Sequence, residues 1–165
     1  MALCEDIGGF QLARRFISVQ PSLSDYWRAV ILFGKNTTCY KFALAKSLLN
    51  FAEQQQTSIS LDDIALEFSK NVCLHLKTND RQGTNSSNSF LNKCRSYNAS
   101  QGSIEELISV TKKQGFNYVF DRFHNLTGDK LPLKFYRKDD DGLGKIILDD
   151  NIFKLIETTS INDLK

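Results

Sequence analysis

The chain has 165 residues, which suits one domain, since domains commonly hold about 100 to 150 residues. Twelve Phe and five Tyr supply apolar surface for a core, so intrinsic disorder is excluded as the default for the whole chain. The 21 Lys and Arg residues against 19 acids leave a net charge of +2, which is too small to indicate a polyanionic partner, so any basic patch has to be local.

The first 23 residues differ in composition from the rest. Two adjacent glycines, two adjacent arginines and Pro21 interrupt any long regular element there. We therefore expect residues 1–23 to form an N-terminal arm with one short helix over residues 10–19. Residues 24–165 are expected to form a single helical domain.

Residues 24–52 predict two apolar helices joined by a Gly-Lys-Asn-Thr-Thr turn. Ser24 or Asp25 can accept hydrogen bonds from the free amides at the start of the first helix, and Thr37 or Thr38 can do so for the second. In the second helix, apolar side chains at helical spacing predict a buried stripe, which consists of Tyr40, Leu44, Leu48 and Phe51. The charged residues expected to remain in solvent are Lys41, Lys46 and Glu53.

The third predicted helix has the clearest beginning. Ser60 followed by Asp63 resembles a capping box, and acidic residues suit the positive end of a helix dipole. Apolar residues then trace one face through four turns, namely Leu61, Ile64, Ala65, Phe68, Val72 and Leu76.

Residues 78–103 are dense in Asn, Ser and Gly and predict a loop, interrupted by a short helix over residues 87–97. Ser103 begins a capping box that opens the next helix, and Gly115 is expected to close it. Residues 116–126 suit either a helix or an extended segment, and we favour a short helix.

A β-hairpin is predicted near residues 131–148. Its strands would cover residues 130–137 and 145–148 about an Asp-Gly turn, with Pro132 confining the first strand to an edge. A last helix follows, and its candidate N-caps are Asp149, Asp150 and Asn151. The polar tail beyond this helix is expected to close nothing.

Together these elements predict a mainly α fold of five to seven helices with a small C-terminal β-hairpin that packs on them. The core is expected to include Trp27, Val30, Ile31, Tyr40, Leu44, Leu48, Ile64, Phe68, Val72, Leu107, Phe120 and Phe123.

The four cysteines are Cys4, Cys39, Cys73 and Cys94, and no CxxC pair occurs. Since only His75 and His124 could add histidine ligands, no zinc site is predicted. Cys39 and Cys73 lie in apolar helical stretches and no secretory leader is present, so we expect reduced thiols in a cytoplasmic protein. The longest uncharged apolar run, residues 29–34, is far shorter than the roughly 18 residues of a membrane span.

Catalytic motifs are missing from the sequence: GxxxxGK[ST], GxGxxG, GxSxG and HExxH do not occur. His124 has no partner nearby in the sequence, and we interpret it as a partly buried histidine bonded to the backbone rather than a general base. Residues 139–142 lack the spacing of a calcium loop and suit a hairpin turn better. No catalytic residue, metal ligand or cofactor is therefore predicted, and enzymatic activity stays an open question.

The strongest local excess of positive charge flanks the Asn/Ser-rich loop. Its members, offset only by Asp80, are Lys70, Lys77, Arg81, Lys93 and Arg95. Such residues beside Ser and Asn can bind a nucleic-acid backbone, but a solvated surface of an ordinary protein has the same composition. A second group would extend the patch only if the fold brought it there, namely Lys112, Lys113, Lys134, Arg137 and Lys138.

Five blocks follow one another within residues 24–160: YWRAVILFGKNTTCYKFALAKSLL, SISLDDIALEFSKNVCLHLK, SIEELISV, FNYVFDRFHNL and LPLKFYR. In this order they resemble the N-terminal region of a group of bacterial HNH endonuclease-type proteins. In that family the nuclease motif lies downstream, and a ββα-metal site hydrolyses phosphodiesters. This chain has no His-Asn-His pattern and no flanking CxxC pairs after Phe135, so none of the family's catalytic residues can be placed on it.

Two hypotheses follow. In the first, the chain is a non-catalytic nucleic-acid-binding or recognition module of an HNH endonuclease-type protein in genome defence or mobile-element biology, which contacts DNA through the basic residues. It would be part of a longer nuclease or a version that lost the nuclease. In the second, the chain is a protein-interaction or oligomerisation module that docks a partner subunit or a second copy without nucleic-acid contact.

Overall fold

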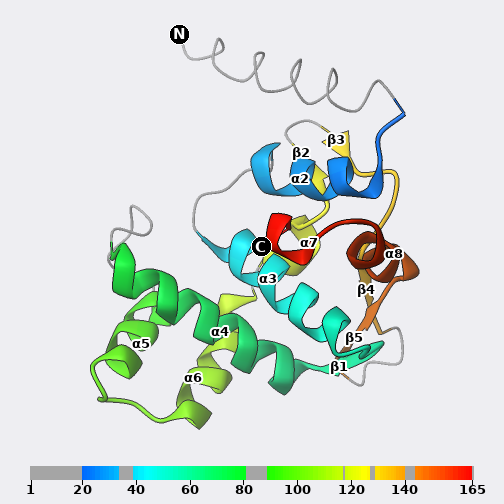
Figure 1. Cartoon of the computed structure of the whole chain (residues 1–165). Helices are drawn as coiled ribbons and strands as arrows, with labels where there is room; N and C mark the ends of the chain where they lie inside the picture. The colour runs from blue at the N-terminus through cyan, green and yellow to red at the C-terminus, as the bar shows by residue number, and fades with distance from the viewer. Residues whose placement is uncertain are drawn as a thin grey trace, which may run out of the picture.

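The computed structural model describes residues 20–33, 39–80, 89–116, 118–126, 129–139 and 144–164. Over these ranges the chain is mainly helical, with seven α-helices and a three-stranded antiparallel sheet that contains the C-terminal hairpin. The predicted fold class is therefore confirmed. Figure 1 places α4, α5 and α6 on one side of the molecule, while α2, α3, α7, α8 and the sheet make up the other side. The helix predicted over residues 10–19 lies outside the described residues.

The first described helix, α2 (Leu23–Phe33), begins two or three residues earlier than its predicted caps imply. The Asp25 N–H donates to Ser22 Oγ at 3.2 Å, and the Ser22 N–H donates to the Asp25 carboxylate at 2.9 Å. Ser22 is thus the N-cap of a reciprocal capping box, and the prediction of Ser24 or Asp25 as the N-cap is wrong. The hydrogen bonds from Ser22 lower the pKa of Asp25 below its ordinary value.

The next two helices pack against each other. Helix α3 (Tyr40–Glu53) begins after Cys39, whose side chain makes no capping bond, while the predicted caps Thr37 and Thr38 lie outside the described residues. Helix α4 (Leu61–Thr78) begins as predicted, because Ser60 Oγ accepts the Asp63 N–H at 3.1 Å. Its predicted stripe is also confirmed, since all six residues except the half-buried Leu61 are buried.

Helices α5 (Ser89–Asn98) and α6 (Ile104–Val110) cover α4 from the other side. The first confirms the short helix predicted inside the Asn/Ser-rich segment, and the second opens with the predicted capping box at Ser103. Helix α6 continues into a π-helical turn over Thr111–Gly115, in which the Phe116 N–H donates to the Thr111 carbonyl at 3.1 Å. The helix therefore closes at Gly115 as predicted, but through a widened turn.

The ambiguous segment after this turn contains both kinds of structure. Helix α7 (Val119–Arg122) follows Tyr118, which has a φ of 74°. Strands β2 (Asn125–Leu126) and β3 (Asp129–Lys130) then pair antiparallel. Lys130 was predicted to belong to the hairpin strand, but it pairs with Asn125 instead.

The three-stranded sheet has the order β1-β5-β4. The predicted hairpin is present as β4 (Tyr136–Lys138) and β5 (Lys145–Leu148), with Tyr136 opposite Leu148. Its turn falls largely outside the described residues. Strand β1 (Ser58–Ser60) was not predicted as a strand, and it pairs with the other edge of β5, which makes β5 the central strand.

The last helix, α8 (Asp150–Thr158), is capped by Asp149, which was one of the three predicted candidates, and a 3-10 turn (Ile161–Asp163) follows it. The expectation that the tail closes nothing is wrong. Leu164 is buried, and its carbonyl accepts a hydrogen bond from Trp27 Nε1 at 3.3 Å. The tail therefore covers the largest side chain of the core.

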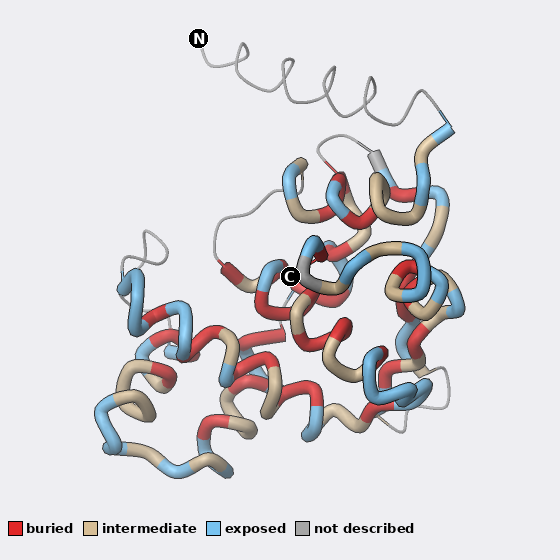
Figure 2. Tube along the Cα trace, in the orientation of Figure 1, coloured by how far each residue is buried: buried red, intermediate tan, exposed pale blue. Residues whose placement is uncertain are grey.

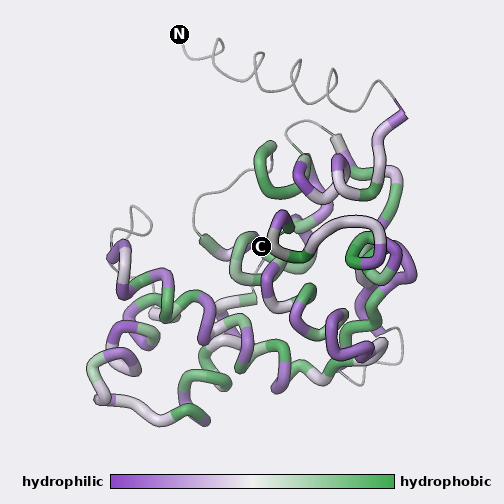
Figure 3. The backbone as a smooth tube through the Cα atoms, in the orientation of Figure 1, coloured by the Kyte–Doolittle hydropathy of each residue, from purple (hydrophilic) through white to green (hydrophobic). Residues whose placement is uncertain are grey.

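One hydrophobic cluster joins the seven described helices and the three-stranded sheet. Of the twelve residues predicted for the core, ten are buried, and Ile31 and Tyr40 are partly buried against them. The buried stretches of the trace in Figure 2 face the middle of the molecule, and the hydropathy along α4 alternates between apolar and polar in Figure 3. A chain of aromatic contacts runs through this core, from Tyr40 through Phe68 and Phe116 to Phe120 and Tyr136.

Candidate functional site

The basic residues predicted around the Asn/Ser-rich loop are partly neutralised in the structure. Lys93 Nζ lies 2.5 Å from Glu106 Oε2, and Arg95 Nε lies 2.6 Å from Asp80 Oδ1. The hydrogen bond from Lys93 lowers the pKa of Glu106. Lys70 and Lys77 are exposed on α4, and Arg81 lies outside the described residues. Of the predicted patch, the structure therefore describes two exposed lysines and two cations that are paired with carboxylates.

The second basic group comes together around β4. A cavity of about 370 Å³, which we call the cationic hollow, is lined by four cations of the segment from β3 to β4. These are Lys130, Lys134, Arg137 and Lys138. Lys134, Arg137 and Lys138 belong to the second basic group identified in the sequence. The other two members of that group lie elsewhere, since Lys112 lines a neighbouring cavity and Lys113 lines neither cavity.

Within the part of the chain that the structure describes, one acidic side chain lines the cationic hollow. It belongs to Asp121, whose carboxylate lies 2.7 Å from Lys138 Nζ. No ion pair of Lys134 occurs within the part of the chain that the structure describes. Among the described residues, the lining of the hollow therefore contains four cations and one acid, a composition that suits an anionic ligand.

His124 lies in the lining of the same hollow. Its Nε2 accepts the Phe135 N–H at 3.0 Å, and its ring lies 4.8 Å from the ring of Tyr136. Burial, with the nearby charges of Lys134 and Lys41, lowers the pKa of His124 to about 4. The imidazole is thus neutral at pH 7 and holds the backbone in place, which agrees with its interpretation from the sequence.

Lys41 is buried behind this hollow, and the prediction that it remains in solvent is wrong. Its side chain is 6 % exposed, and its Nζ donates to the Asn125 carbonyl at 2.9 Å. Burial lowers the pKa of Lys41 to about 8. The helical spacing in the sequence could have indicated this burial. Lys41, Ala45, Leu48 and Ala52 follow one another at intervals of three or four residues, so they lie on one face of the helix, and all of them are buried.

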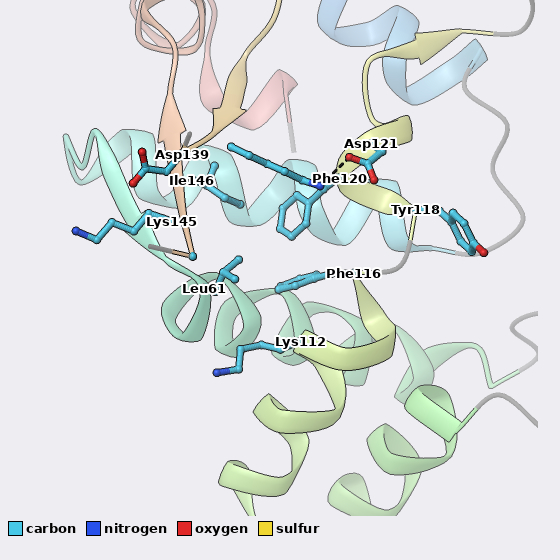
Figure 4. A pocket seen from close by; sticks show the side chains of 11 residues that line it. Leu61, Lys112, Phe116, Tyr118, Phe120, Asp121, Asp139, Lys145 and Ile146 are labelled. Atoms are coloured by element: carbon cyan, nitrogen blue, oxygen red, sulfur yellow. Dashed lines mark hydrogen bonds and ion pairs between the residues drawn. The ribbon is translucent and has the colours of Figure 1, made fainter. Parts of the chain in front are cut away.

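A second cavity, of about 570 Å³, lies between α4, the π-helical turn, α7 and the sheet. Its apolar wall consists of Leu61, Phe116, Phe120 and Ile146, and we call it the aromatic cavity. Figure 4 shows these four side chains pointing toward one another, with Tyr118 pointing away. The rings of Phe116 and Phe120 lie 4.4 Å apart between centroids. The cavity therefore offers a wall of aromatic and aliphatic groups.

Charged residues surround the apolar wall of the aromatic cavity. Its cations are Lys112, Lys138 and Lys145, and its acids are Asp121 and Asp139. Lys112 Nζ is paired with Asp62 Oδ1 at 2.6 Å, and in Figure 4 Lys112 and Lys145 extend to the same side of the cavity. Cavities of about 300 to 1,000 Å³ with a mainly apolar lining and a few polar groups are typical small-molecule sites.

The two cavities adjoin each other. Phe120, Asp121 and Lys138 line both of them, so the Lys138–Asp121 ion pair stands between the aromatic cavity and the cationic hollow. Both side chains of this pair are more than half exposed, and exposed ion pairs contribute only about 0 to 1 kcal/mol. The sequence could not reveal this arrangement, because its residues come from segments that are distant along the chain.

Three cysteines and Tyr136 are buried in the core. Cys39, Cys73 and Cys94 are buried and form no disulfide with one another, and burial raises the pKa of Cys39 to about 11. The hydroxyl of Tyr136 donates to the Phe120 carbonyl at 2.9 Å, and burial raises its pKa as well. Within the described residues, no three His, Cys, Asp or Glu side chains are grouped to hold a metal ion.

None of the helices in the described ranges combines the length and the apolar character that crossing a membrane requires. Comparison with known proteins yields no relative, since no family model matches the chain and neither a curated protein nor a solved structure matches it significantly.

Proposed function

We propose that this chain is a nucleic-acid-binding module that holds the phosphate backbone at the cationic hollow. The observation that carries the proposal is the gathering of Lys130, Lys134, Arg137 and Lys138 around one depression, in whose described lining Asp121 is the one acid. Lys and Arg side chains at phosphates supply most of the affinity of such proteins, because they release the counterions of the nucleic acid.

The proposal shifts the expected contact from the loop patch to the hollow. The loop cations Lys93 and Arg95 have carboxylate partners, which phosphates would have to displace. Lys70 and Lys77 remain exposed on α4 and would add a secondary contact. The resemblance to HNH endonuclease-type proteins supports the same class of ligand, and it would make the chain the recognition part of such a nuclease.

Fluorescence anisotropy with labelled single-stranded and duplex DNA, from about 50 to about 200 mM salt, tests the proposal. The hollow variant carries Lys134→Gln, Arg137→Gln and Lys138→Gln, and the matched loop variant carries Lys70→Gln, Lys77→Gln and Lys93→Gln. We expect the hollow variant to bind more weakly and to lose roughly 2 to 3 from the slope of log K against log salt. The loop variant should retain most of its affinity.

If the loop variant loses its affinity for DNA instead, the contact lies at the basic residues around the Asn/Ser-rich loop, as predicted from the sequence. Absence of DNA binding even at low salt would overturn the nucleic-acid proposal for both surfaces.

A second candidate function, a protein-interaction or oligomerisation module, is favoured by one observation. Phe42 on α3 and Leu74 on α4 are 49 % and 54 % exposed, and both line a cavity of about 390 Å³ between these helices. Large exposed apolar side chains that share a groove are typical of interfaces. Sedimentation across a protein concentration series would show a second copy docking there, and Phe42→Ser with Leu74→Ser should abolish the association.

A further inference from the structure

The aromatic cavity and the cationic hollow differ in chemistry although they share a wall. The aromatic cavity presents Phe116 and Phe120 among aliphatic groups, while the hollow presents cations and one acid. A nucleotide has the same two parts, since its base is a flat apolar ring system with polar edges and its phosphate is an anion. Taken together, the two depressions therefore match the two parts of a single nucleotide.

We propose that this chain binds an unstacked nucleotide, with the base in the aromatic cavity and its phosphate in the cationic hollow. The inference rests on the proposed function and deepens it, because it makes single-stranded nucleic acid the preferred ligand. In a duplex each base is paired and stacked, and it has to leave the stack before it can enter a cavity. Single strands present their bases without that cost.

The residues between the two depressions suit the join between base and phosphate. Lys138 lines both cavities and can follow a phosphate into the hollow, because its partner Asp121 is held only by an exposed ion pair. Once released, the Asp121 carboxylate can accept hydrogen bonds from the amino groups at the edge of a base. Lys145 also lines the cavity and adds positive charge, whereas the ammonium group of Lys112 is paired with Asp62.

A neighbouring nucleotide would find a stacking surface beside the cavity. Tyr118 is 66 % exposed, and the Arg122 guanidinium lies 4.6 Å from its ring centroid. In Figure 4 its ring points away from the cavity, next to α7. Exposed aromatic rings within a positively charged surface are the usual platform on which successive bases of a single strand stack.

The experiment compares ligands that differ only in their bases. The full chain is titrated with a labelled single strand of about 12 nucleotides, an abasic strand of the same length, and a duplex of the same sequence. We expect the base-containing strand to bind about tenfold more tightly than the abasic strand, and more tightly than the duplex. Equal affinity for the two strands, or preference for the duplex, would overturn the inference while leaving the proposed function intact.

A cavity-filling variant locates the base. Leu61→Trp places a large ring in the half-buried wall of the aromatic cavity, and Leu32→Trp, at an exposed position of α2, is its control. Leu61→Trp should abolish the difference between the two strands and retain the affinity for the abasic strand, whereas Leu32→Trp should retain both. If the difference survives in a folded Leu61→Trp protein, the base does not enter this cavity. Leu61→Phe replaces it should the larger side chain lower the melting temperature.

Competition with adenosine monophosphate distinguishes a strand from a free nucleotide as the source of the ligand. Displacement of the labelled strand by adenosine monophosphate, but not by inorganic phosphate, supports a site for one nucleotide whatever its source. If adenosine monophosphate does not displace the labelled strand, and Leu61→Trp loses the preference for the base-containing strand, the site is part of a surface that binds a strand. If no nucleic acid binds at low salt, the proposed function itself has failed, and that result is distinct from equal binding of the two strands.

Discussion

Lys41 places an ammonium group in the interior, where the Asn125 carbonyl at 2.9 Å is its hydrogen-bond acceptor. Burial disfavours the charged form, which is why its pKa is about 8 instead of the ordinary 10.5. In the unfolded chain the group regains its ordinary pKa. Between these two values the unfolded state binds more protons than the folded state, so the free energy of unfolding increases as the pH rises through this window.

This sign leads to a prediction for Lys41→Met, which keeps the length of the side chain and removes the charge. At pH 7 the wild type carries the cost of the buried charge, and by about pH 10 it has lost most of that cost. We expect the stability of the wild type relative to the variant to increase by roughly 2 to 3 kcal/mol between these pH values. Urea unfolding of both proteins at four pH values measures the difference, in which the titration of all other groups cancels.

A pH-independent difference between the two proteins would mean that the Lys41 amine keeps its ordinary pKa in the folded state. A buried ammonium group without a carboxylate partner would then have to be stabilised by more than the one carbonyl.

At the scale of elements, the π-helical turn depends on a glycine. A Cβ built on Gly115 would lie 3.3 Å from two atoms of the Phe90 ring and 3.2 Å from Thr111 Cγ2. The Phe90 ring is stacked on Phe68 within the core and cannot move away freely. The missing side chain of Gly115 therefore lets α5 approach the end of α6.

We predict that Gly115→Ala lowers the free energy of unfolding by roughly 1 to 3 kcal/mol, the usual cost of overpacking a core. Gly102→Ala is the matched control, because its Cβ would meet nothing closer than 3.7 Å. That substitution should be neutral or slightly stabilising, since alanine restricts the unfolded chain. Denaturation midpoints of the two variants give the comparison, and equal midpoints would show that Phe90 adjusts without strain.

Local sequence patterns predicted the helices well because the determinants of a helix lie within one or two turns. The capping residues Ser60 and Ser103, each with an acidic residue three positions later, fixed two helix starts correctly. Strand β1 escaped prediction because its partner β5 lies more than 80 residues further along the chain. Three residues of strand leave no periodic pattern of their own.

The candidate site was predictable only in part, for the same reason. The sequence identified Lys134, Arg137 and Lys138 as basic residues that the fold had to bring together, and they line one hollow. It could not indicate that Phe116 and Ile146 would share a second cavity with Lys138, since that depends on how α6, α7 and the sheet pack. The carboxylate partners of Lys93 and Arg95 likewise come from other helices or their ends.

At the scale of the whole molecule, the two ends of the described chain meet. Trp27 on α2 packs against Phe123 and Phe135, and its indole N–H donates to the carbonyl of Leu164, 137 residues away. Leu164 is itself buried. The tail after α8 is therefore part of the core, although its composition is polar.

Removal of residues 161–165 should lower the free energy of unfolding by roughly 2 to 4 kcal/mol, which combines one buried leucine with one hydrogen bond. Trp27 is the single tryptophan of the chain, so its fluorescence should shift to longer wavelength as water reaches the ring. A chain that lacks only Lys165 is the control. Unchanged emission in the longer deletion would mean that the tail does not cover Trp27 in solution.

The π-helical turn has a further consequence for how the chain tolerates insertions and deletions. A π turn contains about one residue more than an α-helical turn, so loss of any one residue from 111–115 would let α6 run on as a regular helix. Everything after it would then be rotated by about 100° around the helix axis. Phe116, which follows directly, would leave its contacts with Phe68 and Phe120. The number of residues in this segment is therefore more strictly constrained than the identity of most of them, because the position of Phe116 in the aromatic cavity depends on the extra residue of the π turn.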